Sequence, residues 1–203
     1  MNFNAMSAFG CVLTLACVQC GGGVSNADSA RRAYVGFDKG VSRAISLGFD
    51  GLTAASSANI PEQTAAGDVM GTMLVAGQVS QGSSTNREMR LTVQVTDYQD
   101  MVVDMPDDAG AGTTLRHRYS TVMGQTPLPL TISLRPPMFT GTLTGTVRMA
   151  GELAGDVTFN LVLAGQVESP MGMPTRFQRV PNGTRITGTV TSPYGTYTVD
   201  VTR

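Results

Sequence analysis

The sequence predicts a mainly β protein, with a strongly curved antiparallel sheet (barrel, half-barrel or sandwich) and one N-terminal amphipathic helix. Two patterns indicate this fold class. Apolar side chains at three- and four-residue steps occur near the N-terminus, whereas a period of two dominates from residue 68 onward. In addition, glycines interrupt the apolar faces of the expected strands, which is typical of sheets that bend sharply.

The chain begins with an uncharged leader, residues 1–20, followed by a glycine-rich spacer, residues 21–24. The apolar stretch 9–18 has the length of a signal-peptide apolar region and is too short to span a bilayer. All three cysteines lie in this leader. The body therefore has no disulfide framework, no thiol nucleophile and no cysteine metal site.

Residues 14–17, Thr-Leu-Ala-Cys, resemble the end of a bacterial lipoprotein signal, in which a small residue precedes the cysteine that receives the lipid. Leu13 lies one place earlier than in that signal, and no lysine or arginine opens the leader. The resemblance implies lipidation at Cys17, and Val18 resembles the outer-membrane sorting class. It therefore implies a cell-envelope protein held by a lipid anchor at the periplasmic or surface face of the outer membrane. An ordinary secretory signal and a buried N-terminal strand are the alternatives.

Residues 25–48 are predicted to form the amphipathic helix. Ser25 and Asp28 have the spacing of a capping box, and Gly48 is a plausible C-terminal stop. One face carries the apolar residues Ala30, Tyr34, Phe37, Val41 and Ile45. Gly36 and Gly40 each cost about 1 kcal/mol relative to alanine, so the helix needs a sheet to pack on. It is either a packing helix or a lid over a cavity.

Residues 49–67 are small and polar and are predicted to be a connector, and residues 68–203 form the antiparallel β domain. The clearest strand is 139–149, where apolar residues and glycine alternate with threonine. Further strands are expected at 89–95, at 157–167 and in a C-terminal hairpin, 186–201, that turns at 193–195 and is preceded by a turn at 181–183.

An internal repeat is possible between residues 66–104 and 154–200. An Ala-Gly-Asp-Val tetrapeptide begins each segment, and Ala-Gly-Gln-Val follows ten residues later in both. Coincidence in a chain rich in glycine, alanine, valine and threonine is the alternative.

Composition excludes several functions. The net charge is −1 with both signs mixed, so the basic stripe needed for nucleic-acid binding is missing. The single histidine, His117, excludes a histidine-rich zinc site within one chain. Aromatic residues make up 6% of the chain, which disfavours a sugar-binding module and the aromatic girdles of a transmembrane barrel.

Acidic residues crowd the segment 97–108 ahead of two glycines. Oxygen ligands on such a loop could hold Ca²⁺, with Asp104, Asp107 and Asp108 as the candidate ligands. Their spacing does not match the twelve-residue helical calcium loop, and a solvated acidic loop is the alternative. We expect no resident cofactor.

His117 lies between Arg116 and Arg118, in a stretch that is an exposed strand by default. Alternation places the two arginines on one face, with His117 and Tyr119 on the other. His117 could act as a general base, with a pKa lowered by its cationic neighbours.

Three functions follow, in decreasing order of support. The first is a structural or surface-interaction protein with a filled core and an envelope protein as partner. The second is a carrier that holds an apolar, lipid-like ligand between the sheet and the helix; it resembles the lipid-carrier half-barrels of bacterial envelopes in architecture only. An enzyme comes last, because the sequence has no nucleophile elbow, phosphate loop or metal signature.

Overall fold

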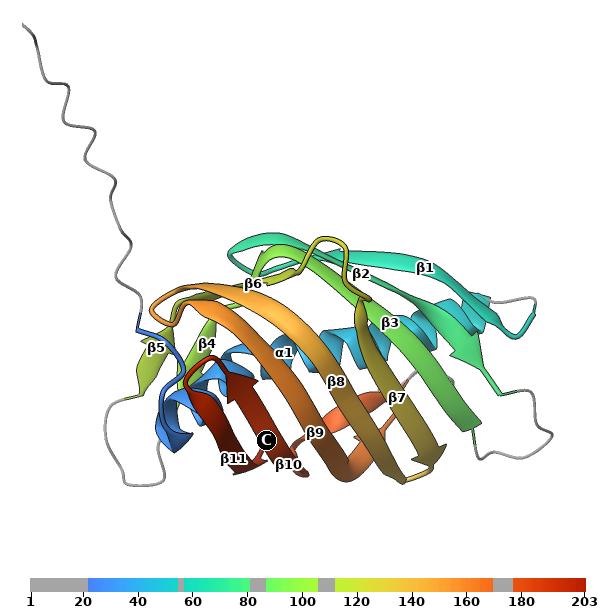
Figure 1. Cartoon of the computed structure of the whole chain (residues 1–203). Helices are drawn as coiled ribbons and strands as arrows, with labels where there is room; N and C mark the ends of the chain where they lie inside the picture. Colours follow the sequence, from blue (N-terminus) through green and yellow to red (C-terminus); the bar gives the residue numbers. More distant parts are fainter. Residues whose placement is uncertain (1–21, 55–56, 81–86, 106–111, 170–176) are drawn as a thin grey trace, which may run out of the picture.

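The computed structural model describes residues 22–54, 57–80, 87–105, 112–169 and 177–203. Within them one helix is followed by a large, curved antiparallel sheet, which confirms the predicted fold class (Figure 1). The elements are α1 (Ala27–Ala54), β1 (Asn59–Ala66), β2 (Met70–Val79), β3 (Arg87–Gln99), β4 (Val102–Asp104), β5 (Thr113–Leu115), β6 (His117–Thr121), β7 (Leu128–Arg135), β8 (Met138–Gly151), β9 (Gly155–Glu168), β10 (Gln178–Ser192) and β11 (Gly195–Thr202).

The main sheet runs in the order β1-β2-β3-β6-β8-β9-β10-β11, and every pair in it is antiparallel. Strand β7 also lies between β3 and β8, so β6 and β7 occupy the same position in the sheet at opposite ends. Strands β4 and β5 form a separate two-stranded sheet. The main sheet arches around α1, which lies along its concave face and contacts both edge strands, β1 and β11 (Figure 1).

The predicted helix face is confirmed. Tyr34, Phe37 and Ile45 are at most 1% exposed, and they belong to one hydrophobic cluster with the inward side chains of the sheet. The alternating patterns of β3, β8, β9 and the β10–β11 hairpin are confirmed as well. The core is therefore a single body of side chains between α1 and the sheet. Among the described residues, no helix combines the length and the apolarity that crossing a membrane requires.

The start of the helix differs from the prediction. The helix begins at Ala27, and Asn26, not Ser25, is its cap. The Asn26 side chain accepts a hydrogen bond from the Ser29 amide at 2.8 Å, and the Ser29 hydroxyl accepts one from the Asn26 amide at 3.0 Å. This reciprocal pair satisfies the amide groups at the helix start with an asparagine and a serine in place of the expected residues.

The end of the helix and the connector also differ from the prediction. The helix does not stop at Gly48 but continues to Ala54, and residues 59–66 of the expected connector form the edge strand β1. Its small and polar residues carry no apolar alternation because most of them face solvent at the edge of the sheet. Residues 181–183 are likewise not a turn between strands but a bulge inside β10.

Three glycines explain how closely α1 approaches the sheet. A Cβ atom on Gly36 would lie 2.5 Å from the Tyr119 hydroxyl, and one on Gly48 would lie 2.7 Å from a Leu91 methyl. On Gly40 it would lie 3.0 Å from the Tyr98 ring. The space above each glycine is therefore filled by a large side chain of the sheet. What looks like a helix weakness in the sequence is a packing requirement.

The two segments of the possible repeat form comparable hairpins, β2–β3 and β9–β10. Their registers differ by two residues, because Arg90 pairs with Gln78 whereas Arg185 pairs with Ala164. The third strands also diverge, since β11 joins the main sheet whereas β4 pairs only with β5.

Replacing Gly36 by alanine should lower the free energy of unfolding, because the added methyl group displaces the Tyr119 ring at a cost of about 1–3 kcal/mol. The gain of about 1 kcal/mol in helix propensity offsets only part of that cost. Urea unfolding of the variant checks this, with Ser46→Ala on the same helix as the control. A rise in midpoint for Gly36→Ala would contradict the close packing.

Candidate functional site

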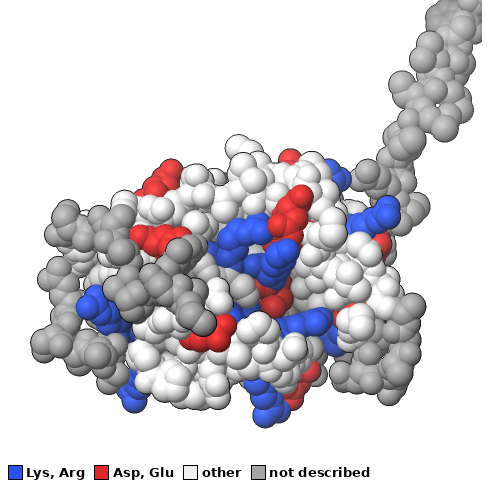
Figure 2. Space-filling model, turned by 180° about the vertical axis from the view of Figure 1, so that it is seen from behind, with Lys and Arg blue, Asp and Glu red and all other residues white. Residues whose placement is uncertain are grey.

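The side of α1 that the sheet leaves uncovered carries most of the helix's charged residues. These residues form ion pairs and hydrogen bonds with strands and loops on both sides of the helix. Figure 2, which views the molecule from behind, shows basic and acidic side chains gathered across this face. Three clusters of ion pairs and hydrogen bonds make up the arrangement, each centred on an aspartate. We call them the Asp104, Asp100 and Asp38 clusters.

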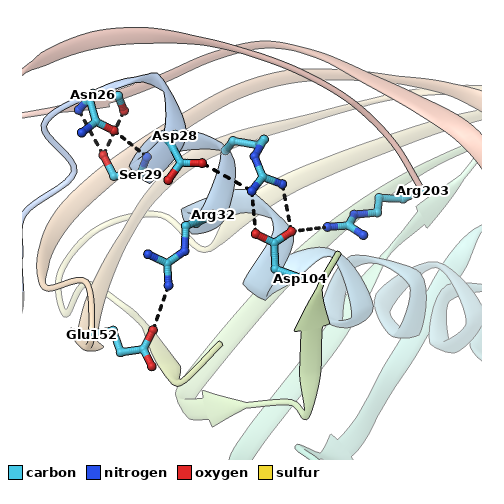
Figure 3. Close-up of polar contacts among 8 residues, drawn as sticks. Asn26, Asp28, Ser29, Arg32, Asp104, Glu152 and Arg203 are labelled. Carbon is cyan, nitrogen blue, oxygen red and sulfur yellow. Dashed lines mark hydrogen bonds and ion pairs between the residues drawn. The ribbon is translucent and has the colours of Figure 1, made fainter. Parts of the chain in front are cut away.

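In the Asp104 cluster, Asp104 at the end of β4 joins the helix to the residue that follows β11 (Figure 3). The Arg31 guanidinium donates to both carboxylate oxygens, at 2.9 and 2.5 Å, and Arg203 donates to one of them at 3.2 Å. The Asp104 side chain is 5% exposed. Hydrogen bonds from Arg31, together with the charges of Arg31 and Arg203, hold the pKa of Asp104 below its usual value.

The Asp100 cluster lies farther along the helix. Arg43 donates to Asp100 at 2.9 Å, to the Tyr98 hydroxyl at 2.7 Å and to Asp68 at 2.8 Å. Lys39 also donates to Asp68, at 2.5 Å. This hydrogen bond is the largest of the effects that lower the pKa of Asp68 to about 2. Burial, followed by the hydrogen bond to Asp100, raises the pKa of Tyr98.

The Asp38 cluster connects the helix to β10. One Asp38 oxygen accepts hydrogen bonds from the Tyr34 hydroxyl at 2.6 Å and from the Arg179 guanidinium at 2.9 Å. Arg179 also donates to the Ser42 hydroxyl at 2.9 Å and to Thr184 at 3.2 Å. The Arg179 side chain is 5% exposed, so this is a nearly buried ion pair whose remaining donors are largely satisfied.

The predicted site residues are only partly covered by the structure. Cys17, Asp107 and Asp108 lie outside the described residues. Asp104, the described member of the expected calcium set, is held by two guanidinium groups. Among the described residues, no three histidine, cysteine, aspartate or glutamate side chains come together as metal ligands.

The exposed position expected for His117 is wrong, although the alternation around it is right. His117 starts β6 and is 2% exposed, and both of its ring nitrogens lack a hydrogen-bond partner within the described ranges. The ring packs between Gly36 of the helix and the edge of Tyr119. Burial lowers the pKa of His117 to about 4, opposed by the charge of Glu152 and reinforced by that of Arg32. The described part of the chain therefore gives His117 none of the hydrogen bonds that orient a general base.

A separate cavity of about 510 Å³ lies where the chain passes from β6 to β7. Its lining comes from β3, β6 and the connecting residues 122–127, and includes Gln94, Thr96, Ser120 and Met123. None of the described residues that line it has a charged side chain. Its surface is therefore one of hydroxyl, amide and apolar groups.

Sequence reasoning missed the role of Arg179 and Arg43. A signal existed for Arg179, because it lies two residues after Phe177 and so falls in the inward register of β10. An arginine in an apolar register indicates a buried ion pair. Arg43 offered no such signal, because its partners Asp68 and Asp100 reach it only through the fold.

Comparison of this chain with protein families, with characterised proteins and with solved structures finds no match.

Stability should decrease on acidification before the carboxylates titrate. Because the pKa of His117 is about 4 in the folded chain and about 6.5 for a histidine in an unfolded chain, the unfolded chain binds more protons below pH 6.5. The stability that depends on neutral His117 is fully present above pH 6.5 and is lost as the pH falls toward 4. At pH 5 the free energy of unfolding should be lower by about 2 kcal/mol. Urea unfolding between pH 7.5 and 4.5 measures the slope, and His117→Leu should flatten it. An unchanged slope in that variant would refute the assignment.

Removing the Asp104 carboxylate should destabilise the fold far more than removing an exposed one. Asp104→Ala leaves Arg31 and Arg203 without their shared partner, at a cost of about 2–4 kcal/mol. Asp200→Ala is the matched control, because Asp200 also accepts two hydrogen bonds from one arginine, Arg185, but on an exposed surface. Thermal unfolding of both variants tests this, and equal losses would contradict it.

Proposed function

We propose that this chain is an exported cell-envelope lipoprotein, anchored through Cys17 to the outer membrane, with a structural or surface-interaction role and no catalytic activity. The observation that carries the proposal is the helix that fills the concave face of the sheet. A protein whose inner face is occupied by its own helix meets its partners through its outer surface.

Ring contacts show how thoroughly that face is filled. Phe37 lies 4.9 Å from the Tyr119 ring, 6.1 Å from Phe159 and 6.4 Å from Tyr98, measured between ring centroids. Together with the three glycines pressed against the sheet, these contacts make α1 part of the core. An apolar ligand inside the sheet would have to displace it and expose the largest buried side chains.

The position of the first described residues supports an anchor close to the body. Gly22 bridges to Leu153 beside the β8–β9 turn, and Ser192 donates to the Val24 carbonyl at 2.6 Å. Gly22 lies five steps along the chain after Cys17, and an extended chain of that length spans at most about 18 Å. A lipid on Cys17 therefore keeps this end of the sheet near the membrane. Tyr194, 66% exposed in the β10–β11 turn, lies at the same end.

Exposed apolar side chains favour surface interaction. Every second residue from Met101 to Met105, in and around β4, is apolar and exposed. Met101, Val103 and Met105 are 65%, 48% and 62% exposed. Methionine side chains adapt to irregular partners. Asp38, Asp100 and Asp104 are each paired with an arginine, which supports a role as ion-pair partners and favours the non-catalytic assignment.

Metabolic labelling with a fatty acid tests the anchor. The wild-type chain expressed in a Gram-negative host should incorporate the label and fractionate with the outer membrane, whereas Cys17→Ala should do neither. Cys20→Ala is the matched control and should remain labelled. Labelling of Cys17→Ala, or a soluble wild-type chain, would overturn the anchor.

Native mass spectrometry of the same purified protein tests the filled core. The mass should equal that of the processed chain with its covalent lipid and nothing else. A further non-covalent mass of lipid size, released on denaturation, would instead support the carrier of an apolar ligand.

A further inference from the structure

A second cavity, of about 260 Å³, lies between α1 and the last strands of the sheet. Asp38 and Ser42 line it from the helix, Arg179 and Asn182 from β10, and Arg203 from the residue after β11. It thus sits on the uncovered side of the helix, next to the Asp38 cluster. The ion pairs described above use some of these groups, but they do not use all of the donors.

The cavity is built by an irregularity of β10. Arg179 pairs with Val167 and Thr184 pairs with Gly165, so five steps along β10 match two steps along β9. The extra residues of β10 therefore have no partner in the β9 register, and one of them, Asn182, has a positive φ of 55°. Bulges of this kind re-aim side chains and concentrate at functional sites. Here the bulge forms one wall of the cavity and leaves Asn182 exposed at its mouth.

Arg179 is fixed in the wall with one edge open. Its Nε and Nη1 atoms donate to Thr184, Asp38 and Ser42, so the guanidinium plane cannot rotate freely. Its Nη2 atom has no hydrogen-bond partner among the described residues. The Nη2 group is therefore the donor that Arg179, a residue of the cavity lining, has left for a ligand.

The side chains of the described lining carry a net positive charge. Arg179 and Arg203 contribute two guanidinium groups, and Asp38 contributes one carboxylate. That carboxylate already accepts hydrogen bonds from Tyr34 and Arg179. Arg203 uses only its Nη2 atom on Asp104 within the described residues, which leaves its other donors available.

We propose that this cavity, which we call the Arg179 pocket, binds the oxyanion of a small ligand, a carboxylate or a phosphate monoester. A rigid guanidinium with a free edge, a second guanidinium beside it and a neutral amide and hydroxyl are the donors that such groups require. The volume is smaller than that of a cavity for a drug-sized molecule, so the pocket takes the charged group and leaves the rest of the ligand outside. This inference goes beyond the proposed envelope role and does not depend on the anchor.

Titration of the full chain with sodium phosphate and with sodium acetate tests the proposal. The readout is the Arg179 Nε–Hε signal in ¹⁵N-correlated NMR, followed at constant ionic strength with sodium chloride as the reference. We expect a saturable shift with at least one of the two anions. Saturation by phosphate alone indicates a phosphate monoester, and saturation by acetate alone indicates a carboxylate. The absence of a saturable shift with either anion overturns the proposal.

Variants separate the pocket from a general salt effect. Arg203→Gln keeps Arg179 and its partners and should weaken binding at least about tenfold, since it removes one charge-assisted donor. Arg185→Gln is the matched control, because Arg185 lies on β10 like Arg179 but outside the pocket, where it is paired with Asp200. This variant should bind the anion as the wild type does. Equal weakening by both substitutions would overturn the proposal. Failure of the fatty-acid labelling would not affect it.

Discussion

The contact between helix α1 and the concave face of the sheet is the interaction on which the other features depend. Gly36, Gly40 and Gly48 let the helix backbone approach Tyr119, Tyr98 and Leu91 until no room remains for a methyl group. Phe37 then inserts among three aromatic rings. Because dense packing of this kind tolerates little change in volume, the helix and the sheet form one core.

The depth of the helix also explains the charge clusters. Because the helix lies deep in the concave face, its polar side chains lie close to the surrounding strands. Arg31 pairs with Asp104 on β4, Arg43 pairs with Asp100 after β3, and Asp38 pairs with Arg179 on β10. Since both partners are partly buried, their pairing matters more than that of exposed pairs. The same placement leaves Arg179 and Arg203 lining a cavity beside the helix. The proposed anion pocket therefore depends on the position of the helix.

Burial, not neighbouring charge alone, decides the state of His117. The flanking arginines suggested a lowered pKa in the sequence, and the pKa is lowered, but chiefly because the ring is removed from water under the helix. The residue therefore couples the helix–sheet contact to pH. Burial also decides the surroundings of the acidic segment. Asp100 and Asp104 point toward arginines of the helix and away from solvent.

Local patterns in the sequence determined the fold class, the apolar helix face and the alternation of β3, β8 and β9, because burial of one face imposes a period that any window of ten residues displays. They missed β1, whose small residues at a sheet edge need no such period, and they took the β10 bulge for a turn, because Pro-Asn-Gly suits both. The leader predicted a location in the cell envelope, because a signal peptide is recognised as a linear segment. Only the tertiary structure decided which charges meet. Arg179 lies 141 residues from Asp38, and Arg31 lies 73 residues from Asp104. Such pairs are fixed by the curvature of the sheet around the helix, a property of the whole chain that no local segment encodes.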